Sequence, residues 1–132
     1  MRKITSLVIL IATLLSLCSC DAFKSSFRAV GLVRSNNSHS CKASFLSLEG
    51  ELVFKLKKSD AGKGEISYAV KAEEGEITLY YAIGEEKAEL VTVKNGESVT
   101  ECGGTVEGKE TVYIIIEGKE KARGKVTVEL DN

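Results

Sequence analysis

Residues 77–83 read Ile-Thr-Leu-Tyr-Tyr-Ala-Ile, with an apolar side chain at every second position: Ile77, Leu79, Tyr81 and Ile83. Successive side chains of a β-strand point to opposite faces, so this period of two predicts a strand with one face on a core and one in water. The same alternation recurs in residues 52–57, 66–71 and 126–130. Most of the chain is therefore predicted to be built from strands.

The segment 112–116 differs from the others because it does not alternate. It reads Val-Tyr-Ile-Ile-Ile. A short continuous apolar run is typical of a strand that is covered on both faces or lies at the centre of a sheet. We therefore predict a central strand that contains residues 113–116.

Glycine separates the strand-like segments, and the chain contains no proline. Glycine follows Glu or Asn at the ends of several segments: Glu49-Gly50, Glu74-Gly75, Asn95-Gly96, Glu107-Gly108 and Glu117-Gly118. These pairs predict turns, and Asn-Gly is the strongest hairpin signal among them. Seven or eight short strands at this spacing predict an all-β fold, an antiparallel β-sandwich of the immunoglobulin-like or jelly-roll-like kind.

The N-terminus has the pattern of an export signal. Arg2 and Lys3 precede a run of about 14 mostly apolar residues, from Ile4 to Leu17. A membrane-spanning helix needs ~20 such residues, so the run fits the apolar core of a signal peptide better. The alternative is an ordinary secretory signal or an uncleaved anchor.

The apolar run ends in Leu17-Cys18-Ser19-Cys20, which resembles the lipobox of bacterial lipoproteins. The resemblance implies cleavage after residue 19 and a diacylglycerol on the Cys20 thiol. It also implies a mature protein held by its acyl chains on the extracytoplasmic face of a membrane. Cys18 stands where the box usually has Ser, Ala or Thr, and it is small enough to take that place.

These features divide the chain into three parts. We expect a signal peptide at residues 1–19, the lipidated Cys20 with a tether at 20–40, and one β-sandwich domain at 41–132. Within the tether, residues 27–33 are apolar enough either to add an early strand or to pack on the domain.

The strand pattern of residues 76–81, 111–118 and 124–130 also resembles the small β-sandwich modules of secreted bacterial proteins, such as those appended to proteases. Such modules are generally non-enzymatic and serve binding, adhesion or support. The acidic residues that hold calcium in some of them are missing here. Because unrelated functions share this fold, the resemblance bears on architecture rather than on activity.

The charge balance excludes one class of partner. From Cys20 onward the chain carries 16 Lys and Arg residues against 19 Asp and Glu residues. Because Lys and Glu are interspersed, we expect a solvated surface with no strong field, and no nucleic-acid partner.

Cys41 and Cys102 are the cysteines that remain after processing. In an exported chain such a pair most simply forms a disulfide, which on the chain-entropy model stabilises by roughly 4 kcal/mol. The alternative is a thiol-based enzyme or redox protein, because His39, the single histidine, lies two residues before Cys41. One His and two Cys are too few for a zinc site, so we expect no metal and no other cofactor.

Tyr80 is the candidate for a ligand or partner surface. Alternation points Tyr68 and Tyr81 inward and Tyr80 outward. An outward ring either contacts a ligand or pairs with a neighbour across the strands.

Two classes of function therefore remain. The first is a lipid-anchored, non-enzymatic cell-envelope protein, a binding or structural module for an unknown protein or envelope polymer. The second is the thiol-based enzyme or redox protein that uses Cys41, His39 and Cys102. The bonding state of the two cysteines distinguishes these classes.

Overall fold

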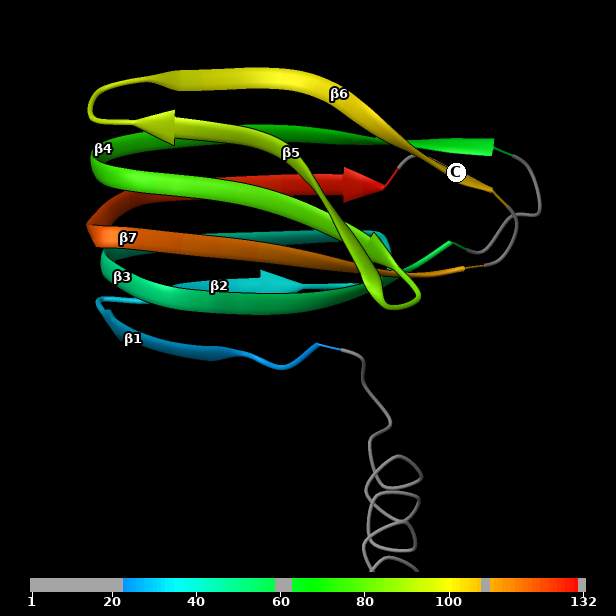
Figure 1. Cartoon of the computed structure of the whole chain (residues 1–132), viewed down its shortest axis with the longest axis horizontal. Helices are drawn as coiled ribbons and strands as arrows, with labels where there is room; N and C mark the ends of the chain where they lie inside the picture. Colours follow the sequence, from blue (N-terminus) through cyan, green and yellow to red (C-terminus); the bar gives the residue numbers. More distant parts are fainter. Residues whose placement is uncertain (1–22, 59–62, 108–109, 131–132) are drawn as a thin grey trace, which may run out of the picture.

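The computed structural model describes residues 23–58, 63–107 and 110–130, and its regular elements are all β-strands (Figure 1). The strands are β1 (Ser26–Val30), β2 (Val33–Asn36), β3 (Ser40–Lys57), β4 (Lys63–Ile83), β5 (Glu86–Lys94), β6 (Ser98–Glu107) and β7 (Thr111–Leu130). Their number agrees with the prediction, but β3, β4 and β7 are not short, with 18, 21 and 20 residues. Within the described residues, no helix is long and apolar enough to cross a membrane.

The three long strands bend near their middles, so that each contributes one half to each of two layers (Figure 1). Layer A contains β2, β6 and the stretches 40–45, 63–72 and 124–130 of the long strands. Layer B contains β1, β5 and the stretches 48–57, 76–83 and 111–119. The order is β2-β3-β7-β4-β6 in layer A and β1-β3-β7-β4-β5 in layer B. The predicted antiparallel β-sandwich is confirmed.

Three of the glycines that were predicted to end strands lie inside long strands, at or near the corners of the sandwich. Gly50, Gly75 and Gly118 lie within β3, β4 and β7, so the turns predicted there are wrong. Gly50 shows the reason: its φ is +105°, and a Cβ atom at this residue would overlap the carbonyl oxygen of Ser26. A strand that passes from one layer to the other needs such close backbone approach, and glycine permits it as it permits a turn.

The Asn95-Gly96 turn is present, but the hairpin predicted from it is wrong. The amide of Glu97 donates to the carbonyl of Lys94 at 2.8 Å, which closes the turn. β5 and β6 on either side pair with different halves of β4, one in each layer. Asn95 holds the turn against the corner of β4, because its Oδ1 accepts from the amide of Gly75 at 2.7 Å.

The sandwich begins earlier than residue 41. β1 pairs with residues 47–51 of β3, and β2 pairs with residues 41–44 of the same strand. Residues 26–36 are thus edge strands, and the tether predicted to run to residue 40 is too long. Of the two alternatives for residues 27–33, the early strand is the correct one. The signal peptide and Cys20 lie outside the described residues.

β7 is the central strand that the run 112–116 predicts. It pairs with β3 on one side and β4 on the other, and Val112 through Ile116 are all buried. Val112, Ile114 and Ile116 belong to the core between the layers, whereas Tyr113 and Ile115 belong to a second apolar cluster. The second cluster lies on the outer face of layer B.

Candidate functional site

Tyr80 lies on the outer face of layer B, as alternation predicts. It is half-buried, and its register partners are Ile115 on β7 and Glu89 on β5. The inward direction of Tyr68 and Tyr81 agrees as well, since Tyr68 belongs to the core between the layers and Tyr81 packs against it.

Charged side chains from neighbouring strands surround the Tyr80 ring. Its hydroxyl donates to Oε1 of Glu117 at 3.2 Å. The Nζ atom of Lys87 lies 4.4 Å from the ring centroid and 3.1 Å from Oε2 of Glu51. We call Tyr80, Lys87, Glu51, Glu89 and Glu117 the Tyr80 face. An ammonium at this distance is attracted by the ring quadrupole. Because Lys87 also pairs with Glu51, it links β5 to β3 across β4 and β7.

The surroundings of Tyr80 raise the pKa of its phenol. Burial raises the pKa of Tyr80, and the carboxylates of Glu117, Glu89 and Glu51 raise it further. An anionic phenolate would be repelled by these carboxylates. The hydroxyl therefore donates its hydrogen bond to Glu117 up to a higher pH than an unperturbed tyrosine would.

A buried apolar floor supports this face. Ile115 is fully buried and Ala82 is 1% exposed, although both lie on the outer side of the sheet. Tyr80 and Val53 pack against them, together with Phe23. The Phe23 and Tyr113 ring centroids are 5.5 Å apart, so the N-terminal segment covers part of the outer face. This cover explains why residues 112–116 do not alternate.

The predicted disulfide is not formed in the structure, where Cys41 and Cys102 are both free thiols. Cys41 lies in the core on β3, whereas Cys102 is exposed on β6. β7 and β4 separate these strands in layer A, a separation of about 14 Å at ~4.8 Å per strand. A disulfide requires Cα atoms within about 7 Å, so the sheet order prevents the bridge.

The two thiols are also not one reactive site. Burial raises the pKa of Cys41 to about 12, so its thiol stays protonated and is a poor nucleophile at neutral pH. Cys102 lies on the outer side of layer A, where its Sγ atom is 3.4 Å from Oγ of Ser67. His39 is half-buried immediately before β3 begins. Cys41 and Cys102 therefore do not act together at one thiol site.

We predict a large difference in reactivity between the two thiols. In the folded protein at pH 8, a thiol reagent should modify Cys102 and leave Cys41 unmodified. After denaturation without reductant it should modify both. A Cys102→Ser chain should show no fast reaction, and fast reaction in that chain would contradict the burial of Cys41.

The raised pKa of Cys41 also gives a pH dependence. The unfolded thiol ionises at its ordinary value of 9.0, whereas the folded one ionises at about 12. Between pH 9 and 12 the unfolded chain releases the Cys41 proton while the folded chain keeps it, which favours unfolding. The free energy of unfolding should therefore fall as the pH rises from 9 toward 12. A Cys41→Ala chain should show a smaller fall.

Sequence reasoning found Tyr80 but missed the charged residues around it. Lys87, Glu51 and Glu117 read as solvated charges, because the chain does not say which strands are neighbours. The sequence did hold one sign that this outer face is covered: Tyr113 and Ile115 are large apolar residues at outward positions. Among the described residues, no group of three or more His, Cys, Asp and Glu side chains is placed to hold a metal ion.

No protein-family model matches the sequence, and no curated protein matches it either. Solved structures of similar fold include a mutant of the family 29 carbohydrate-binding module CBM29-2 complexed with mannohexaose. It is 14% identical, with 82% of this chain and 91% of that chain covered and a TM-score of 0.44. TmCBM61 in complex with β-1,4-galactotriose is 15% identical, with 76% and 68% covered and a TM-score of 0.40. Similarity this distant says nothing about what the present chain binds.

Proposed function

We propose that the protein is a lipoprotein whose β-sandwich is a non-enzymatic binding module on the extracytoplasmic face of a membrane. Acyl chains on Cys20 hold it there, and the Tyr80 face binds a hydroxyl-rich polymer of the cell envelope, such as a polysaccharide. The observation that carries the binding role is the Tyr80 face itself, a half-buried aromatic ring with ordered charges on four paired strands.

The chemistry of the face fits such a polymer. The carboxylates of Glu51, Glu89 and Glu117 accept hydrogen bonds from hydroxyl groups, and the ammonium of Lys87 donates to them. The ring of Tyr80 can meet the C–H groups of a sugar when the Lys87 ammonium, which lies 4.4 Å from its centroid, turns to the sugar hydroxyl groups. All five side chains project from hydrogen-bonded strands, so little ordering is needed on binding.

The alternative function, a thiol-based enzyme or redox protein, lacks support from the arrangement of the thiols. The Cys41 thiol faces the core, and Cys102 is exposed on the outer side of another strand. The lipobox at Leu17–Cys20 supports the anchor instead, through its resemblance to lipoprotein signals.

Processing is the first test of this proposal. Mass spectrometry of membrane-extracted protein should detect an N-terminal peptide that begins at acylated Cys20. A Cys20→Ala chain should be neither lipidated nor cleaved by the lipoprotein peptidase. Recovery of a free amino terminus at another residue would disprove the anchor.

Ligand binding is the second test. A Tyr80→Ala chain should lose at least about tenfold in affinity for envelope polysaccharide, the loss expected when a central aromatic contact is removed from a binding surface. Binding can be measured by retention on immobilised polymer or by calorimetry. Thr127→Ala, at an exposed position of layer A, is the matched control and should bind like the wild type. Equal binding by the Tyr80→Ala and Thr127→Ala chains would exclude the Tyr80 face as the ligand surface.

A further inference from the structure

Charge is segregated along this chain in a way that the overall balance hides. Residues 22–48 contain four Lys or Arg residues and no Asp or Glu. Residues 49–132 contain 12 Lys or Arg residues and 18 Asp or Glu residues. The interspersed charges that predict a field-free surface are thus a property of the second part alone.

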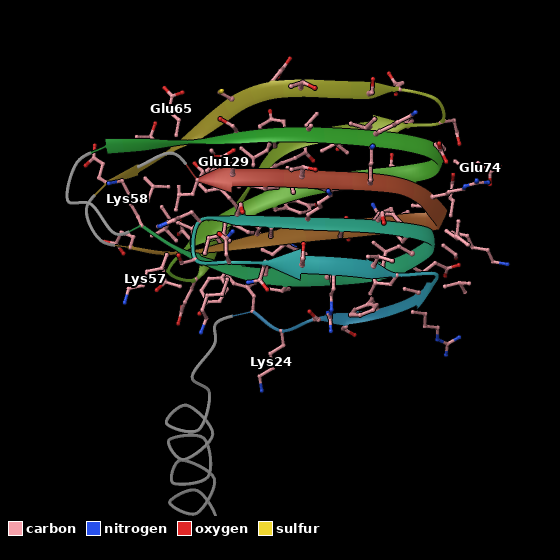
Figure 2. The ribbon with its side chains drawn as sticks, turned by 180° about the vertical axis from the view of Figure 1, so that it is seen from behind. Lys24, Lys57, Lys58, Glu65, Glu74 and Glu129 are labelled. Atoms are coloured by element: carbon pink, nitrogen blue, oxygen red, sulfur yellow. The ribbon has the colours of Figure 1, made fainter. Side chains whose placement is uncertain are left out.

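The fold gathers the basic segment at one edge of the sandwich. β1 is the edge strand of layer B and β2 is the edge strand of layer A, on the same side of β3. Lys24, Arg28 and Arg34 are exposed along this edge. Figure 2 shows Lys24 beside the β1 edge, pointing away from the sandwich, and Glu65 toward the opposite edge of the sandwich.

Two of these residues have defined surroundings. The guanidinium carbon of Arg34 on β2 lies 5.9 Å from the Phe27 ring centroid on β1, so Arg34 reaches across the opening between the layers. Arg28 lies opposite Glu49 in the register of β1 and β3. Glu51, the next carboxylate along β3, is engaged by Lys87 on the Tyr80 face.

The same edge carries exposed apolar side chains. Among the described residues, the large hydrophobic side chains that stand exposed are Val30, Val33 and Leu46, at 62%, 70% and 58%. Leu46 lies beside the turn between β1 and β2, because a Cβ atom on Gly31 would lie 2.8 Å from its Cγ. Val30 and Val33 stand on either side of this turn, on the outer sides of layers B and A. Basic residues next to exposed apolar residues are typical of surfaces that rest on the headgroup region of a membrane.

We propose that this basic edge, made of Lys24, Arg28, Arg34, Val30, Val33 and Leu46, rests on the anionic phospholipids of the membrane that carries the protein. The inference rests on the proposed lipid at Cys20 and adds the orientation of the domain. Phe23, which packs on Tyr113, follows Cys20 closely in the chain, and the segment that joins them spans at most about 10 Å. Because Lys24 directly follows Phe23 and β1 begins at Ser26, a lipid at Cys20 would keep this edge within reach of the bilayer surface.

This orientation has a consequence for the Tyr80 face. With the β1–β2 edge on the membrane, both sheets stand upright on the bilayer. The Tyr80 face on layer B then points sideways into the surrounding envelope, and β5 and β6 form the edge farthest from the lipid. A polymer parallel to the membrane can reach the face without displacing the anchor.

Fluorescent labels at the two edges permit a direct test on the full, lipid-modified protein in vesicles. A bimane label on Cys102 reports the far edge, because Cys102 is exposed on β6. The same label on Val33→Cys, in a Cys102→Ser background, reports the near edge. In vesicles that contain phosphatidylglycerol and nitroxide-labelled lipid, the label at residue 33 should be quenched severalfold more than the label at residue 102.

Charge is tested by Arg34→Glu, with Lys121→Glu at the exposed corner of β7 as the matched control. Arg34→Glu should reduce quenching at residue 33 toward the level at residue 102, and Lys121→Glu should not. Phosphatidylcholine vesicles or high salt should have the same effect as Arg34→Glu, because both weaken attraction to anionic headgroups. Circular dichroism must show that each variant is folded. If a charge variant does not fold, the comparison of the labels at residues 33 and 102 still tests the orientation, because it needs no charge variant.

Three outcomes would overturn the proposal. Equal quenching at residues 33 and 102, with acylated Cys20 confirmed by mass spectrometry, refutes the orientation and leaves the anchor intact. Quenching at residue 33 that is identical in anionic and neutral vesicles refutes the role of charge. A residue-33 label that responds to soluble polyphosphate but not to vesicles assigns the edge to an anionic polymer instead. Absence of acylation at Cys20 is the separate failure of the proposed anchor.

Discussion

A Gly124→Val chain is expected not to reach the native fold. Gly124 follows the corner of β7 and lies opposite Ala72 on β4. A Cβ atom at residue 124 would overlap the carbonyl oxygen of Lys71 and lie 3.1 Å from Cδ1 of Ile77. Because β7 is hydrogen-bonded to β3 and β4 on its two sides, it cannot move away. We expect a loss of at least about 4–5 kcal/mol, comparable to the whole stability of a small domain.

Urea unfolding followed by circular dichroism measures this effect. Gly84→Ala is the control, because Gly84 has a φ of +78° but a Cβ atom added there would have no heavy atom within 4 Å. Its cost is then the left-handed backbone alone, about 1–2 kcal/mol. A Gly124→Val chain that unfolds within about 1 kcal/mol of the wild type would show that β7 and β4 are not packed as described.

The second large effect concerns the two neighbouring isoleucines of β7. Ile114 faces the core between the layers and Ile115 faces the outer side of layer B, yet both are fully buried. Truncation of a buried isoleucine removes packing and leaves a cavity, which costs about 2–5 kcal/mol. We expect Ile114→Ala and Ile115→Ala both to fall in this range, measured by urea unfolding.

Thr127→Ala, at an exposed outward position of the same strand, should change the stability by at most about 0.5 kcal/mol. Phe23→Ala should lower the stability as well, because Phe23 packs against the cluster that contains Ile115. If Ile115→Ala behaved like Thr127→Ala, the outer face of layer B would be open to water and the support of the Tyr80 face would be lost.

The candidate site could be predicted only in part. The outward direction of Tyr80 follows from the period of two, a property of the strand itself. The contacts around its ring join residues that are far apart in the chain: Tyr80 and Glu117 are 37 positions apart, and Lys87 and Glu51 are 36 apart. No local pattern encodes which strands lie side by side. The failed disulfide has the same origin, because Cys41 and Cys102 belong to strands that the fold keeps apart.

By itself, the sequence determined that most of the described chain is made of strands, that residues 112–116 form the central one and that Ile77, Leu79, Tyr81 and Ile83 face the core between the layers. These features depend on the alternation of side chains within a strand, which is local. The tertiary structure alone decided that Gly50, Gly75 and Gly118 are corners and not turns, that β1 and β2 form one basic edge, and that the two thiols are separate. A glycine permits a turn and a corner equally, and a charge or a thiol acquires neighbours only when distant strands pair.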